Sequence, residues 1–146
     1  MSVDHNLQLR RAILPLIKVE PVVVELAGMR VFSEAPKALP AFPFVRYGNS
    51  DGTPTEWSCT EGSDNAGTIH IFSRADGTDE VARLRRAVCR AIDGKTVQLE
   101  ADADDGKSAT ALNIQVTFLP AIFRDTDDAS AWHGVINWQT EVAEDF

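Results

Sequence analysis

Two long segments near the C-terminus alternate between apolar and polar residues, and this pattern constrains the fold more than any other feature. The first segment, 112–124, has apolar residues at Leu112, Ile114, Val116 and Phe118. The second, 132–142, has them at Trp132, Ile136, Trp138 and Val142. A two-residue period places successive side chains on opposite faces of a strand. Both segments are therefore predicted to be strands of a sheet with one buried face and one face in water.

Three segments have helical patterns instead. Residues 79–93 carry one apolar face and end before Gly94, which suits a helix C-terminus; the face consists of Val81, Leu84, Val88 and Ile92. Residues 7–18 repeat the pattern with Asp4 as the expected N-cap, and Pro15 is expected to kink or shorten this helix. A short helix is predicted from Pro21 to Gly28.

The rest of the chain contains short strands and loops. Strands are predicted at 29–32, 44–47, 68–74 and 96–99. The segment 48–67 is rich in Gly, Ser, Thr, Asn and Asp, and it is interpreted as a long polar loop or a flexible hairpin. The predicted fold class is α+β, a mainly antiparallel sheet with helices packed on one face. The 146 residues are expected to form a single domain, 1–146.

The charge balance limits the partners. The chain has 14 Lys and Arg against 22 Asp and Glu, a net charge of −8. Binding of a nucleic-acid backbone by the whole surface is disfavoured, because that affinity depends on cations replacing counterions. The longest nearly apolar stretch, 12–26, is interrupted by charges and prolines, so no membrane span is predicted.

No motif of a catalytic, phosphate-binding or metal site is present. The chain lacks GxSxG, GxxxxGK[ST], GxGxxG, HExxH and CxxC. We therefore expect no catalytic residue, no cofactor-binding residue and no metal ligand. One alternative stays open: a small metal-binding enzyme that uses His70, His133 and an acidic residue.

Positive charge is concentrated on the predicted helix 79–93. Arg83, Arg86 and Arg90 share one helix face at positions i, i+3 and i+7. These three residues are called the arginine stripe. Three interpretations stay open: a solvent-exposed helix face, a contact with an acidic neighbouring subunit, or direct binding of DNA. Opposite charges on two sides of one subunit suit ring assembly through complementary surfaces.

Five segments, taken in their order along the chain, carry a family resemblance. They are 9–14, 30–36, 42–48, the strand Thr68–Arg74 with the helix after it, and Phe123–Asp125 followed by Trp132–Ile136. This order resembles the tail completion (tail terminator, head–tail joining) proteins of tailed phages and of phage-derived gene transfer agents. The resemblance covers residues 7–142.

The resemblance implies a structural virion protein and no enzyme. Its copies would form a ring, typically a hexamer, at the head-proximal end of the tail tube, after assembly in the bacterial cytoplasm. Implied partners are the chain itself, the tail tube protein and the head–tail connector or stopper protein. DNA would pass through the lumen without specific binding. A connector-side head completion adaptor of the same particle is the alternative. We expect Arg83, Arg86, Arg90 and Trp57 to contribute to interfaces.

Overall fold

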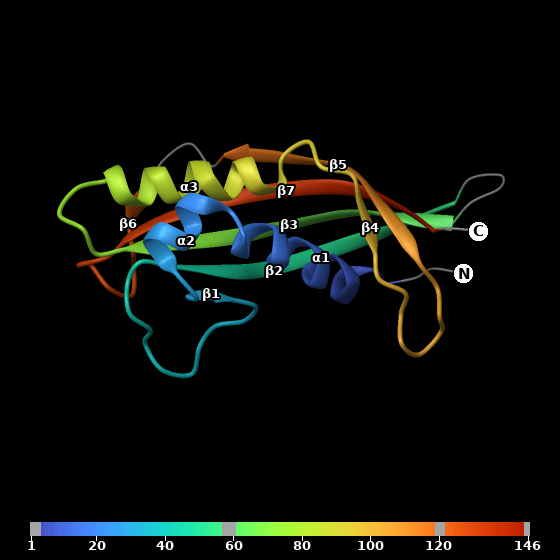
Figure 1. The fold of residues 1–146 in the computed structure, drawn as a ribbon, viewed down its shortest axis with the longest axis horizontal. Coiled ribbons are helices and arrows are strands. Elements are labelled where there is room, and N and C mark those ends of the chain that lie inside the picture. Colours follow the sequence, from blue (N-terminus) through green and yellow to red (C-terminus); the bar gives the residue numbers. More distant parts are fainter. Residues whose placement is uncertain (1–3, 57–60, 119–121, 145–146) are drawn as a thin grey trace.

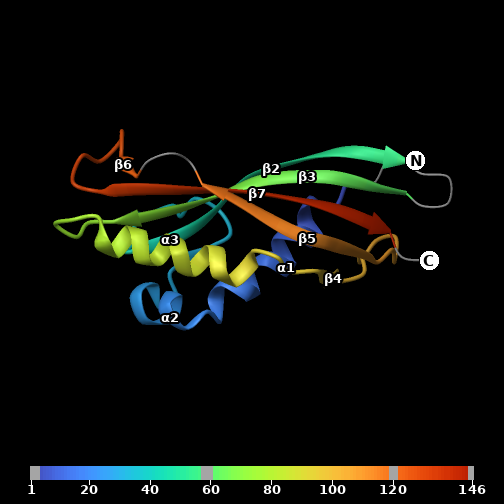
Figure 2. The same cartoon turned by 90° about the horizontal axis from the view of Figure 1, so that it is seen from above.

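A curled sheet with helices on one side forms the framework of the molecule (Figures 1 and 2). The computed structural model describes residues 4–56, 61–118 and 122–144. Within these residues the sheet has seven strands in the order β1-β2-β3-β7-β5-β4, and β6 pairs with β7. Every pairing is antiparallel except that of β1 with β2. The predicted α+β class with a mainly antiparallel sheet is confirmed.

The elements follow the predicted order with changed bounds. The helices are α1 (Asn6–Lys18), α2 (Pro21–Ala27) and α3 (Asp79–Ile92). The strands are β1 (Val31–Phe32), β2 (Phe44–Glu56), β3 (Glu61–Ser73), β4 (Val97–Leu99), β5 (Ala109–Phe118), β6 (Phe123–Arg124) and β7 (Trp132–Glu144). None of the helices in the described part of the chain is long and apolar enough to cross a membrane.

The core lies between α3 and the sheet. The four predicted apolar residues of α3 are fully buried, and they are Val81, Leu84, Val88 and Ile92. Across from them lie Ile69 and Ile71 of β3 and Ile136 and Trp138 of β7, each at most 1% exposed. The helical period of α3 and the strand period of β7 therefore meet in one apolar layer, as the sequence predicts.

The two N-terminal helices differ in detail from their predictions. α1 continues through Pro15 to Lys18, so the expected shortening does not occur. Pro15 is exposed, and its ring lies on the solvent side of the helix. His5, and not Asp4, occupies the N-cap position, while the Asp4 carboxylate accepts a hydrogen bond from the Asn6 amide at 2.9 Å.

The prediction of a long polar loop at 48–67 is wrong, and the alternative of a hairpin is correct. β2 and β3 pair from Phe44↔Phe72 to Glu56↔Glu61, with one register shift between Tyr47 and Ser50. β3 pairs on its other side with β7, from Gly62↔Ala143 to Ser73↔Trp132. Backbone hydrogen bonds to two neighbours therefore hold this polar segment as strand, although it lacks apolar alternation.

The strand predicted over 112–124 is also corrected. β5 ends at Phe118, and Phe123 and Arg124 form the separate strand β6. A register shift between Leu112 and Gln115 interrupts the pairing with β7, and Asn113 has φ 43°. Such a bulge moves the following residues to the other face. Ile114 is therefore buried as predicted, whereas Leu112 is 40% exposed on the opposite face.

Candidate interface surfaces

The arginine stripe lies on the exposed back of α3, and two of its three residues contact α2. Arg83 Nη2 lies 3.4 Å from Glu25 Oε2, and Arg90 Nη2 lies 2.8 Å from Glu20 Oε1. Arg86 is exposed, and it has no ion pair with the residues that the structure describes. The structure thus brings Arg83 and Arg90 into the contact between α2 and α3 and leaves Arg86 directed to solvent.

Glu20 gives Arg90 a role inside the subunit. The Glu20 carboxylate accepts hydrogen bonds from the Val22 and Val23 amides at 2.8 and 3.1 Å, which makes Glu20 the N-cap of α2. Burial opposes ionisation of Glu20, but the hydrogen bonds from Arg90 and from these amides lower its pKa below the ordinary value. Because Arg90 stabilises the start of α2, reversing its charge would disturb the subunit itself.

Trp57, the fourth predicted interface residue, lies outside the described residues. Its role as an interface anchor stays a prediction.

The far side of the sheet carries an aromatic cluster that the alternation pattern did not predict. Phe44 of β2 stacks on Phe72 of β3 with ring centroids 4.7 Å apart. Phe72 stacks on His133 of β7 at 4.4 Å, and Phe123 of β6 lies 4.9 Å from the same imidazole. Phe44 and Phe72 are only 5% and 8% exposed. At this end the sheet is therefore apolar on both faces.

The signal for this cluster was present in the sequence. Phe44 and Phe72 stand at positions that alternate with the buried Val45 and Ile71. Strands with large apolar residues at consecutive positions are typical of sheets covered on both faces.

His70 and His133 are brought together within this cluster. His70 Nδ1 lies 2.8 Å from His133 Nε2, and the two imidazoles share a hydrogen bond. Burial, together with the positive charges of Arg46 and His133, lowers the pKa of His70 to about 4. Burial also lowers the pKa of His133. Both imidazoles are therefore neutral at pH 7, which suits one ring donating its N–H to the other.

The structure does not assemble the metal-site alternative. Within residues 4–56, 61–118 and 122–144, no group of three or more His, Cys, Asp or Glu side chains is placed to hold a metal ion. The pair His70 and His133 supplies two nitrogens only, and a metal site needs three or four converging ligands.

A cavity of about 630 Å³ lies on this aromatic side. Its floor contains Phe44, Phe72 and His133, and its walls are the segments 35–42 and 125–128. Two arginines pack on the aromatic rings: Arg46 lies 5.6 Å from the Phe72 centroid, and Arg74 lies 4.2 Å from that of Phe42. The cavity thus combines an aromatic floor with an acidic wall at 125–128.

The positive charge of Arg74 is already paired with a carboxylate of the acidic wall. It forms an ion pair with Asp128, and hydrogen bonds from Ser130 and Arg74 lower the pKa of Asp128 to about 2. Asp125 and Asp127 have no ion pair among the described residues, and Asp127 is exposed. The wall therefore offers unpaired negative charge at the opening of the cavity.

Charge is distributed unequally along the chain. The segments that hold the helices, 6–30 and 79–95, contain nine Lys and Arg and five Asp and Glu. The remaining residues contain five Lys and Arg and 17 Asp and Glu. The net negative charge of the chain therefore comes from the strands and loops, while the helical segments are net positive.

A polar groove of about 610 Å³ extends along the strands toward the other end of the molecule. Three carboxylates from the neighbouring strands β2, β3 and β7 line it: Asp51, Asp64 and Glu141. Leu112, displaced by the bulge in β5, lies beside them. The groove therefore carries negative charge beside one exposed apolar side chain.

These features define a small α+β protein with its helices on one side of the sheet and, on the other, an aromatic cluster beside an acidic cavity wall. The model of the family "tail completion protein gp17" matches residues 11–140, and the chain belongs to this family. It is thereby a structural protein of phage-type tails.

The comparison with solved structures gives a likeness in fold. A chain from the virion of a native gene transfer agent particle superposes with a TM-score of 0.76 and 18% sequence identity. The match covers 92% of this chain and 94% of that chain. A comparison with curated proteins finds no match.

Proposed function

We propose that copies of this chain form a closed ring, a hexamer, at the head-proximal end of a phage-type tail tube. The ring stops polymerisation of the tube and presents a docking surface to the head–tail connector. Membership of the tail completion family, over residues 11–140, is the observation that carries this proposal. The ring acts through shape and charge and catalyses no reaction.

The charge distribution supports passage of DNA through such a ring. An acidic surface repels the phosphate backbone, because attraction to duplex DNA requires cations that replace its counterions. The groove with Asp51, Asp64 and Glu141 provides such a surface on the sheet side. In the proposed ring this groove faces the lumen, and DNA passes without specific binding.

Particles assembled in cells that do not express this chain test the proposal. We expect DNA-filled heads and tail tubes that are not joined, with tubes of irregular length, seen by electron microscopy of sedimented fractions. Expression of the wild-type chain from a plasmid should restore joined particles, and this is the control. Complete particles without the chain would contradict the proposal.

A map of the intact particle tests the position. We expect density for a ring of this chain at the end of the tail tube nearest the head. Density on the capsid side of the connector would contradict this position and favour a head completion adaptor.

A further inference from the structure

Exposed apolar side chains occur on two opposite sides of the sheet. Across the described residues, four large exposed apolar side chains lie in or beside the N-terminal helices: Leu7, Val19, Val24 and Met29, which is 96% exposed. The other three lie on the far side: Leu39, Leu112 and Phe123. Leu39 and Phe123, which are 67% and 38% exposed, line the aromatic cavity. The apolar patch of the helical side is defined here as Val24 and Met29, and that of the cavity side as Leu39 and Phe123. Leu112 lies in the polar groove instead.

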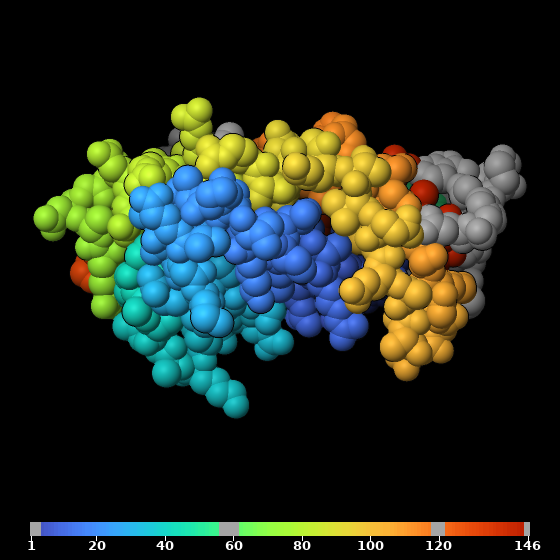
Figure 3. All heavy atoms as spheres, in the orientation of Figure 1, coloured from blue at the N-terminus to red at the C-terminus, as the bar shows by residue number. Residues whose placement is uncertain are grey.

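The charges around the two patches are opposite. α2 and α3 pack together through the Arg83–Glu25 and Arg90–Glu20 pairs. The exposed Arg86 of α3 therefore belongs to the same helical side as Val24 and Met29, which are exposed in and just after α2. The helices form one continuous surface on this side (Figure 3). On the cavity side, the exposed Asp127 stands next to Phe123 and Leu39.

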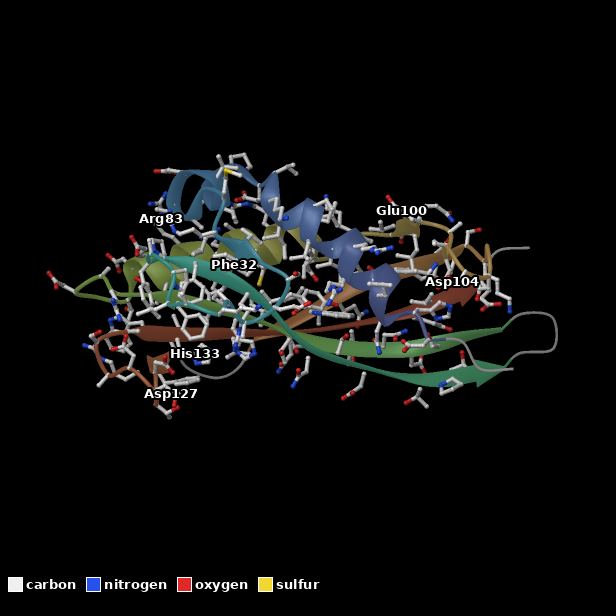
Figure 4. All side chains as sticks on the ribbon, turned by 90° about the horizontal axis from the view of Figure 1, so that it is seen from below. Phe32, Arg83, Glu100, Asp104, Asp127 and His133 are labelled. Atoms are coloured by element: carbon white, nitrogen blue, oxygen red, sulfur yellow. The ribbon has the colours of Figure 1, made fainter. Side chains whose placement is uncertain are left out.

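Both patches lie at the same end of the molecule. Figure 4 shows Arg83 and Asp127 at one end and on opposite sides of the sheet, with Glu100 and Asp104 at the other end. Figure 2 shows all three helices on one side and β6 on the other. A contact between the two patches therefore joins two different surfaces, which is the head-to-tail type that closes into a ring when the rotation allows it.

We propose that the helical patch of one copy, with Val24, Met29 and Arg86, docks at the cavity of the next copy, with Leu39, Phe123 and Asp127. This inference rests on the proposed ring and assigns the two surfaces that build it. The occupant of the cavity is a second copy of this chain, because one sequence supplies exposed apolar side chains and opposite charges on the two surfaces. The carboxylates of Asp125 and Asp127 in the acidic wall disfavour a DNA phosphate backbone as the occupant.

Two single charge reversals test the contact. Arg86→Glu places a carboxylate opposite Asp127, and Asp127→Lys places an ammonium opposite Arg86. We expect each variant alone to need a protein concentration about tenfold or more higher than the wild type before it assembles, because like charges face each other at the contact. Assembly is measured by sedimentation velocity and native mass spectrometry, with and without purified tail tubes.

A mixture of the two variants gives the sharper result. In a 1:1 mixture every contact of an alternating ring is complementary. At one contact the introduced carboxylate at position 86 meets the introduced ammonium at position 127, and at the next the native Arg86 meets the native Asp127. The mixture should therefore form rings with equal numbers of both variants, at concentrations within about threefold of the wild type. An even number of subunits, as in a hexamer, is needed for this result.

Matched controls carry the same charge changes at the other end of the molecule. Lys107→Glu and Asp104→Lys alter the loop between β4 and β5, which lies there, and should leave assembly unchanged. Thermal unfolding of all four variants should match the wild type, since none of the four side chains is buried.

The remaining outcomes separate this inference from the proposed function. Rings that form normally from Arg86→Glu or Asp127→Lys would overturn the inference and leave the ring intact. Normal rings that no longer attach to tubes would also overturn it, and would assign the patch to the tube protein. Wild-type chains that stay monomeric even on tubes would overturn the ring together with the inference.

Discussion

The two ends of the curled sheet are held together by different chemistry. At the end near α3, called the aromatic end, Phe44 and Phe72 stack on one face of the sheet while Ile69 and Ile71 face the helices. At the other end, called the distal arm, the strands β2 and β3 continue beyond Tyr47 and Thr68 with mostly polar residues. One end is a layered apolar core, and the other is an extension of paired backbone.

The buried positions of the distal arm are polar and hydrogen-bonded. Ser63 and Asn65 are 2% and 3% exposed, and Asn65 Nδ2 donates to Ser63 Oγ at 2.6 Å. His5 Nδ1 shares a hydrogen bond of 2.6 Å with the same hydroxyl. Thr140 Oγ1 donates to the Leu112 carbonyl at 2.9 Å. Buried polar groups are tolerated where they are paired in this way. Backbone pairing and such a network thus order the arm without apolar alternation.

The largest expected loss of stability comes from placing a charge in the apolar core between α3 and the sheet, which the distal arm lacks. Val88 is fully buried between α3 and the sheet, and Val88→Asp places an unpaired carboxylate there. We expect a loss of about 3 to 5 kcal/mol in the free energy of unfolding, sufficient to unfold the domain. Circular dichroism and urea titration measure it, and Arg86→Asp on the exposed face of the same helix is the control. A soluble, folded Val88→Asp protein would contradict the burial of this face.

The next prediction compares the contribution to stability of side chains at the two ends, on the face of the sheet opposite the helices. Phe72→Ala removes the ring between Phe44 and His133 and should lower the free energy of unfolding by about 3 kcal/mol. Asp64→Ala, on the exposed face of the same strand in the distal arm, should change it by less than about 0.5 kcal/mol. Urea titration at about pH 7.5, where carboxylates are ionised, measures both. Equal losses would show that the two ends depend on the same kind of contact.

Sequence patterns predicted the parts of the molecule that follow apolar periodicity. The buried face of α3 and the alternation of β7 are both confirmed, because each element buries one face against the other. The distal arm lacks this signal, since its buried positions include Ser63 and Asn65, so the segment resembles a loop in sequence. Leu112 was predicted on the wrong face of β5, because a bulge shifts the pairing register while the apolar–polar alternation in the sequence stays the same.

The candidate surfaces were predictable only in part. The spacing of the arginine stripe indicated one exposed face, but the ion pairs with Glu20 and Glu25 depend on how α2 packs on α3. The aromatic cavity joins residues from β2, β3, β6, β7 and two loops, and no local pattern brings these together. Such a site arises from topology, which a single sequence specifies weakly.

The junction between the two ends gives the third prediction. A Cβ at Gly67 would lie 2.5 and 2.7 Å from ring atoms of Trp138, which is 1% exposed and cannot move freely. Gly67→Ala should therefore lower the free energy of unfolding by about 1 to 3 kcal/mol through overpacking. Gly77→Ala is the matched control, because a Cβ there meets no atom within 4 Å. Thermal unfolding of the two variants measures the difference, and equal midpoints would show that the ring of Trp138 has room to shift.

The smallest expected effect is a dependence of stability on pH, to which the pair His70 and His133 at the aromatic end contributes. The pKa of His70 is about 4 in the folded protein and about 6.5 in the unfolded chain. Between these values the unfolded chain binds more protons, so stability is highest above about pH 6.5 and falls as the pH decreases toward about 4. The pKa values of His133 and His5 are lowered in the same direction, so each adds to the loss. Carboxylates do not contribute strongly between about pH 7.5 and 5.5, because their ordinary pKa values lie near about 4.

Replacing one imidazole isolates its share of this loss. His70→Gln removes a titrating group from the aromatic end, and the decrease in unfolding free energy from about pH 7.5 to 5.5 should become smaller by roughly 0.5 to 1 kcal/mol, since His70 is only half-buried. Urea titrations of wild type and variant at both pH values measure this difference, and the values at the higher pH correct for the lost hydrogen bond to His133. An unchanged pH dependence would show that folding does not lower the pKa of His70, which would contradict the burial of a neutral imidazole in the pair with His133.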